Sequence, residues 1–157
     1  MKRFFLLIGF TSVILYFSGC GALLQTPPRI SMQSLDKNAI ITGMGGGISG
    51  NYDGFVITRS GDVLSWQNPN GKPDSLELIF HTTADSVNFF FRYLDEIGFN
   101  DLSFRSSGNM NSFIERTTPE MKHRVQWATD GGVSAPPEIS TFYSLVRNYA
   151  GRGARKR

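Results

Sequence analysis

The sequence predicts an α+β domain: a mostly antiparallel sheet built from two hairpins, with two helices packed on one face. Two observations support this. Runs rich in β-forming residues come in pairs around turn signals, which is typical of hairpins. Two other segments repeat apolar residues every three or four positions, which is typical of amphipathic helices. The predicted order along the chain is β-β-β-α-β-β-β-α.

The first half of this domain is expected to hold three strands and a helix. Residues 52–58 and 63–67 form a hairpin around a Gly-Asp turn, and residues 76–82 form a third strand after a proline-containing loop. Thr82 or Thr83 suits the N-cap of the first helix. The apolar stripe of that helix consists of Val87, Phe90, Phe91, Leu94 and Ile97.

The second half is expected to add three strands and a helix. Residues 102–104 form a short strand, and residues 111–118 and 121–128 form a second hairpin around a Pro-Glu turn. Two prolines at positions 136 and 137 then open a second helix from 138 to about 149, because proline is well tolerated in the first turn.

Residues 1–19 predict a secretory signal peptide that ends in a lipobox. Two basic residues precede an apolar run from 4 to 17, which is too short for a spanning helix. Residues 17–20 read Phe-Ser-Gly-Cys, and Cys20 is the only cysteine. This resembles bacterial lipoprotein signals, with Phe where Leu is usual. The resemblance implies cleavage before Cys20 and acylation of its thiol and amine, hence a membrane anchor.

The resemblance also bears on localisation. Residue 21 is Gly rather than Asp, so attachment to the outer membrane, facing the periplasm, is expected. The alternative is an ordinary signal peptide that leaves Cys20 unmodified.

The rest of the chain divides into a lipidated tether (20–38), one domain (39–150) and a basic disordered tail (151–157). The formal charge is +3, but six of the 16 basic residues lie in the first three and the last six positions. Ten basic residues then face 13 acidic ones in between. A mildly acidic body lacks the basic face of nucleic-acid binders, so no nucleic-acid partner is expected.

Glycine dominates residues 43–50, and a partner contact is expected there. A phosphate-binding loop would need a Lys-Ser or Lys-Thr pair and a following helix, and both are missing. The segment is therefore predicted to be flexible or a bulged edge strand. Because loops on rigid scaffolds carry function, this segment and the loop 68–75 are expected to contact an envelope protein. The candidate contacts are Gly45, Gly46, Gly47, Gly50, Asn70 and Gly71.

No catalytic residue, metal site or cofactor is predicted. His81 and His123 are the only histidines, each in an expected strand, and neither belongs to a zinc-like spacing. No Gly-x-Ser-x-Gly motif marks a nucleophile. Cross-strand charge pairs are expected in the second hairpin, between the basic and acidic residues of its two strands. They involve Glu115, Arg116, His123 and Arg124.

The body also resembles the emfourin-type inhibitors of thermolysin-like metalloproteases. The stretches 46–50, 124–127 and 136–139 carry this resemblance, which concerns the order of elements more than identity. No inhibitory residue is transferred from it. The functional hypothesis is therefore a lipid-anchored, non-enzymatic interaction module that could inhibit a protease. The rival hypothesis is a small hydrolase or a ligand-binding lipoprotein of the cell envelope.

Overall fold

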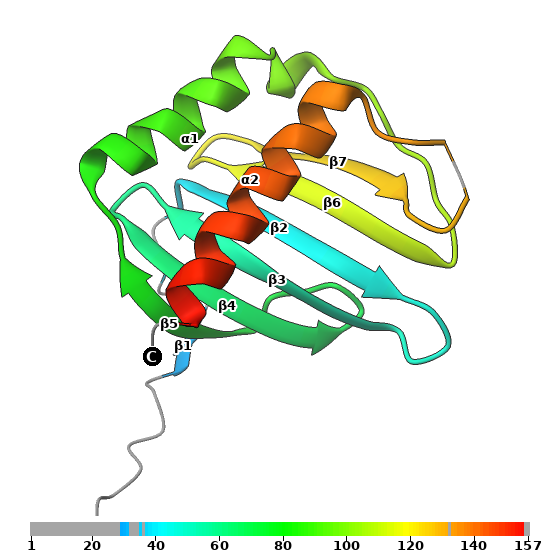
Figure 1. Ribbon diagram of the computed structural model, residues 1–157, viewed down its shortest axis with the longest axis horizontal. Coiled ribbons are helices and arrows are strands. Elements are labelled where there is room, and N and C mark those ends of the chain that lie inside the picture. Colours follow the sequence, from blue (N-terminus) through cyan, green and yellow to red (C-terminus); the bar gives the residue numbers. More distant parts are fainter. Residues whose placement is uncertain (1–28, 32–34, 36, 132, 156–157) are drawn as a thin grey trace, which may run out of the picture.

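In the described part of the chain, five strands precede the first helix and two follow it. Figure 1 shows how these elements are arranged. The computed structural model describes residues 29–31, 35, 37–131 and 133–155. Cys20 and the predicted signal peptide lie outside these residues. The elements are β1 (Arg29–Ser31), β2 (Ala39–Gly46), β3 (Asn51–Thr58), β4 (Asp62–Pro69), β5 (Ser75–His81), α1 (Ala84–Glu96), the 3-10 helix η2 (Phe99–Asp101), β6 (Met110–Thr117), β7 (Lys122–Ala128) and α2 (Pro137–Ala154).

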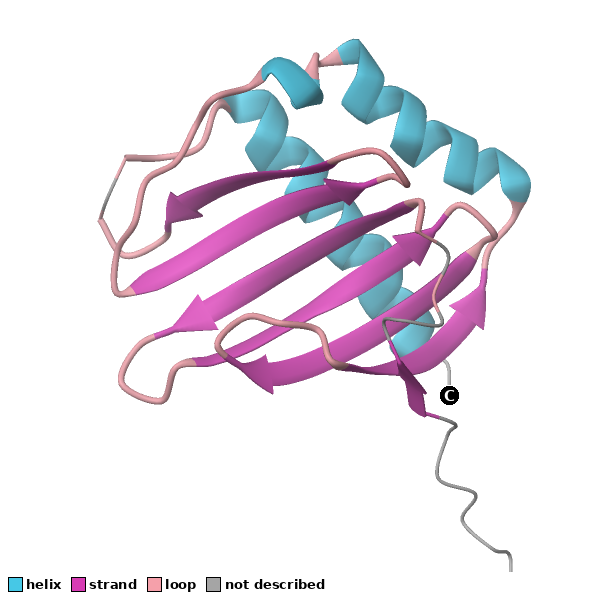
Figure 2. Ribbon diagram, turned by 180° about the vertical axis from the view of Figure 1, so that it is seen from behind, coloured by secondary structure: helices cyan, strands magenta, loops and turns pink. Residues whose placement is uncertain are grey.

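All seven strands join one antiparallel sheet in the order β1-β5-β4-β3-β2-β6-β7. Strand β2 is an interior strand that pairs with β3 on one side and β6 on the other. Both helices lie on the same face, and the opposite face carries none of them (Figures 1 and 2). The predicted α+β class with a mostly antiparallel sheet is confirmed.

The strand count differs from the prediction in three places. Residues 102–104 form no strand, although the adjoining Arg105 makes an isolated bridge to Gln126. Strand β1 lies within the predicted tether 20–38. The glycine-rich residues 43–46 belong to the interior strand β2, not to a flexible segment or an edge strand. Glycine has a low strand propensity, but β2 is kept extended because it pairs with a neighbouring strand on each side.

The main core lies between the sheet and the helices. Helix α1 begins after Thr83, whose side chain accepts a hydrogen bond from the Ser86 N–H (3.3 Å), as predicted for an N-cap. Helix α2 has proline at its first position. Buried side chains from both helices meet buried side chains from six strands, β2 to β7; they include Phe90, Phe91, Leu94, Phe142 and Val146 on the helices, and Ile40, Ile57, Ile114 and Val125 on the sheet.

A second apolar cluster lies on the opposite face of the sheet. Trp66 and Phe113 are its largest members, with ring centroids 6.0 Å apart, and both are buried. The Trp66 Nε1–H donates to the Thr42 carbonyl at 3.1 Å, so the polar edge of the ring is satisfied. Gly43 leaves the space that both rings fill: a Cβ there would lie 2.4 Å from Phe113 and 2.7 Å from Trp66.

Helix α2 extends beyond the predicted end of the domain. It continues to Ala154, so residues 151–154 of the predicted disordered tail are helical. Gly153 packs against the Phe80 ring of β5, where a Cβ would lie 2.0 Å from the nearest ring carbon. This packing explains why the helix persists past Tyr149. Among the described residues, no helix is both long and apolar enough to cross a membrane.

Candidate interaction surface

The predicted contact residues gather at one end of the sheet. Gly45 and Gly46 end β2, Gly47 and Gly50 lie in the β2–β3 turn, and Asn70 and Gly71 lie in the β4–β5 loop. The Asn70 N–H donates to the Gly50 carbonyl at 3.0 Å, which joins the turn to the loop. We call this region, residues 46–50 and 70–74, the loop end.

Left-handed backbone fixes the shape of the loop end. Gly46, Gly47, Gly50, Asn70 and Gly71 all have positive φ, and four of these five are glycine because other side chains rarely adopt that conformation. The Gly47 N–H also donates to the Asn109 carbonyl at 2.7 Å. The turn is therefore held from both sides by neighbouring loops.

Gly45 does not fit the predicted role in partner contact. It is buried in β2, and a Cβ there would lie 2.1 Å from the Asn51 carbonyl oxygen and 2.5 Å from Tyr52 Cα. Its lack of a side chain therefore serves close strand packing. The most exposed large hydrophobic residue of the described part of the chain is one that the sequence reasoning passed over: Ile48, at the tip of the β2–β3 turn, has a relative exposure of 108%. The signal was present, since Ile48 is a lone aliphatic residue between glycine and serine.

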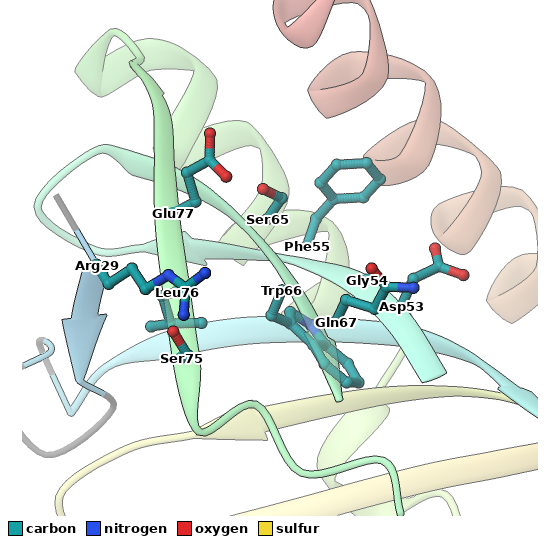
Figure 3. A pocket seen from close by; sticks show the side chains of 10 residues that line it. All are labelled: Arg29, Asp53, Gly54, Phe55, Ser65, Trp66, Gln67, Ser75, Leu76 and Glu77. Carbon is teal, nitrogen blue, oxygen red and sulfur yellow. The ribbon is translucent and has the colours of Figure 1, made fainter. Parts of the chain in front are cut away.

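A polar hollow of about 440 Å³ adjoins the loop end on the helix-bearing side of the sheet (Figure 3). Glu77, Ser65 and Phe55 stand in one row across β5, β4 and β3, because they are register partners. Gln67 and Asp53 form the next row. The volume lies within the range of small-molecule sites.

Charged residues of both signs flank the hollow. Arg29 is the register partner of Glu77 at one side, and Arg147 of α2 pairs with Asp53 at the other, with Nη2 and Oδ2 2.8 Å apart. Burial lowers the pKa of the Arg147 guanidinium, but Tyr143 and Asp53 raise it by more, so the pKa lies above its ordinary value. Arg147 is therefore a permanent cation at this side of the hollow.

Arg147 also links the helix to the middle of the sheet. Its Nη1–H donates to the Tyr143 hydroxyl at 3.2 Å, and that hydroxyl donates to the Gly43 carbonyl at 3.4 Å. The guanidinium carbon lies 5.6 Å from the centre of the Phe55 ring. Sequence reasoning missed the pairing of Arg147 with Asp53 because the two residues lie 94 positions apart in the sequence.

Both histidines have structural partners. His81 Nδ1 lies 2.6 Å from Asp62 Oδ1 in the next strand, and His123 Nε2 lies 3.0 Å from the Leu102 carbonyl. Of the predicted charge pairs in the second hairpin, Glu115 and Arg124 are confirmed at 2.7 Å, whereas Arg116 turns to Asp95 of α1 instead. Within the described residues, no group of three or more His, Cys, Asp or Glu side chains could hold a metal.

A scan of the chain against protein-family models and a search of curated proteins both find no match.

Proposed function

We propose that this chain is a lipid-anchored, non-enzymatic interaction module of the cell envelope that uses its loop end to bind a protein. The exposed Ile48 is the observation that carries the proposal. A fully exposed aliphatic side chain at the tip of a projecting turn is what a partner's apolar pocket would receive, since a few anchors of this kind dominate many interfaces.

The rigidity of the loop end supports the same proposal. The turn is bound to the β4–β5 loop and to Asn109 by backbone hydrogen bonds of 3.0 and 2.7 Å. A preformed turn loses little conformational entropy when it binds, which raises affinity for a given contact area. The resemblance to emfourin-type inhibitors suggests a metalloprotease as the class of partner.

The first experiment tests the loop end in the native envelope. A photo-crosslinking residue at position 48 should give a crosslink to one protein, and the same residue at position 145, an exposed apolar position on α2, should not. Ile48→Asp should remove the interaction, while circular dichroism shows an intact fold. Equal crosslinking from positions 48 and 145 would count against the loop end.

A second experiment addresses the class of partner. A thermolysin-like metalloprotease should lose activity when titrated with wild-type protein and keep it with Ile48→Asp. If neither protein changes the activity, the inhibitor part of the proposal is wrong, while the crosslinking result stands by itself.

The anchor has its own test. Intact mass of the membrane form should match a chain that begins at Cys20 and carries acyl groups, and Cys20→Ser should accumulate as precursor or become soluble. An unmodified chain that begins elsewhere contradicts the anchor.

The polar hollow favours a second candidate, a ligand-binding lipoprotein. Its hydroxyl and amide groups (Ser65, Gln67 and Ser75) and its flanking charges suit a small polar ligand that is uncharged or zwitterionic overall. A thermal-shift screen of amino acids, dipeptides and sugars tests this: a stabilising compound whose effect Gln67→Ala removes would support the candidate.

A further inference from the structure

Two large apolar side chains are exposed on the outer side of the helices. Phe89 of α1 and Leu145 of α2 have relative exposures of 41% and 38%. They border a groove of about 340 Å³ between the two helices, which Phe90 and Tyr149 also line. Aromatic and aliphatic side chains beside a shallow apolar groove indicate a contact surface.

Two basic residues follow Leu145 along α2, one on its side of the helix and one at the C-cap. Arg152 comes seven residues after Leu145, two turns along the helix, so both lie on one side of it. Arg155 caps the helix, and both arginines are exposed. Cations at a helix C-terminus also complement its dipole. Among the described residues that line the groove, Asp85 carries the one carboxylate. We call Phe89, Leu145, Arg152 and Arg155 the helix patch.

The chain enters the domain close to this patch. Arg29 begins β1 nine residues after Cys20, so the two are at most about 30 Å apart. Strand β1 pairs with β5, and the end of α2 packs on β5 through Tyr149 and Phe80, whose ring centroids lie 5.7 Å apart. Figure 1 shows the end of α2 beside β5 and β1, and the β2–β3 turn at the other end of the sheet.

We propose that the helix patch docks on an anionic phospholipid surface. Phe89 and Leu145 would enter the boundary between headgroups and acyl chains, while Arg152 and Arg155 pair with phosphates, as in other interfacial helices. The inference rests on the proposed lipid anchor, which holds the patch near the membrane. Docked in this way, the domain leaves the β2–β3 turn with Ile48, at the other end of the sheet, outside the membrane contact, where an envelope protein can reach it.

A pair of tryptophan variants tests the docked orientation. Phe89→Trp places a reporter in the patch, and Ile48→Trp is the matched control at an exposed apolar site of the loop end. Each full-length protein is produced, purified from membranes and reconstituted in phosphatidylglycerol vesicles that contain headgroup-level nitroxide lipids. Wild-type protein supplies the background from Trp66 and Trp127. Quenching at position 89 should be at least about twofold stronger than at position 48, because headgroup-level quenchers reach only side chains at the interface.

Charge dependence separates docking from simple tethering. Arg152→Gln in the Phe89→Trp protein should lower the ratio of docked to undocked domain about fivefold. Raising the salt from 0.1 to 1 M should weaken the quenching, because the screening length falls from about 10 to about 3 Å. Neutral phosphatidylcholine vesicles should show the same loss.

Equal quenching at positions 89 and 48 would overturn the proposal, as would a protein crosslink from position 89 in native membranes. Measuring the intact mass of the protein distinguishes a failure of membrane docking from a failure of the lipid-anchor proposal. An acylated protein with an unquenched Trp at 89 rejects docking alone, whereas a quenched protein without acyl mass rejects the anchor alone. If Phe89→Trp fails to fold, Leu145→Trp takes its place.

Discussion

Gly43→Ala should destabilise the protein strongly, although alanine is normally the better strand residue. The added Cβ would lie 2.4 and 2.5 Å from two carbons of Phe113 and 2.7 Å from Trp66. Both rings are buried, at 1% and 3% exposure, so neither can move aside freely. Overpacking of this kind costs about 3 kcal/mol at the upper end. Alanine recovers about 1 kcal/mol of backbone entropy. The net loss should be about 2 kcal/mol.

Urea denaturation, followed by circular dichroism, measures this loss in the free energy of unfolding. In thermal unfolding, the melting temperature should fall by about 8 °C. Gly151→Ala is the matched control: it makes the same change in helix α2, where the added Cβ would have no neighbour within 4 Å. That variant should gain about 0.5 to 1 kcal/mol, because glycine weakens a helix interior. Phe113→Leu combined with Gly43→Ala should recover part of the lost stability.

The packing argument fails if Gly43→Ala melts at or above the wild-type temperature. It also fails if the stability losses of Gly43→Ala and Phe113→Leu simply add in the double variant. Two neighbouring residues that share one space should not behave independently.

Three further changes test other parts of the structure. Arg124→Met should cost about 2 kcal/mol in chemical denaturation, because Glu115 is 1% exposed and would keep only its contact to Lys122. Thr83→Ala should cost about 1 kcal/mol by the same measurement, since the N-cap bond to Ser86 is lost; Thr83→Ser should restore it. Asp53→Asn should cost less than about 1 kcal/mol, because that carboxylate is half exposed, and a larger melting shift would mean that the side of the hollow beside Arg147 is more rigid than its exposure suggests.

The sequence predicted those elements that are stabilised by interactions between residues close together in the chain. The turn at residues 59–62 and the cap at Thr83 act between near neighbours, so the first hairpin and helix α1 could be placed from the sequence. Strand β2 could not, because its order comes from pairing with β6 across a large sequence separation. Its glycines signalled flexibility, yet Gly43 and Gly45 serve packing.

The candidate surfaces were only partly predictable. Composition marked the glycine-rich turn and the 68–75 loop, and the structure brings them together through the Asn70–Gly50 hydrogen bond. The polar hollow was not foreseen, because its lining residues come from four strands, β1, β3, β4 and β5, which only the assembled sheet brings together. The helix patch was hidden for a similar reason, since it needs Phe89 and Leu145 on two neighbouring helices.

The position of β2 between β3 and β6 also has a consequence for how the chain folds. Its partners in β6 follow more than sixty residues later, as in the Ala39–Thr117 and Gly46–Met110 pairs. Contacts between residues so far apart in the sequence form late and slow the folding reaction. Until β6 pairs with it, one edge of strand β2, which carries the apolar Ile40 and Ile41, stays open to pairing with other chains.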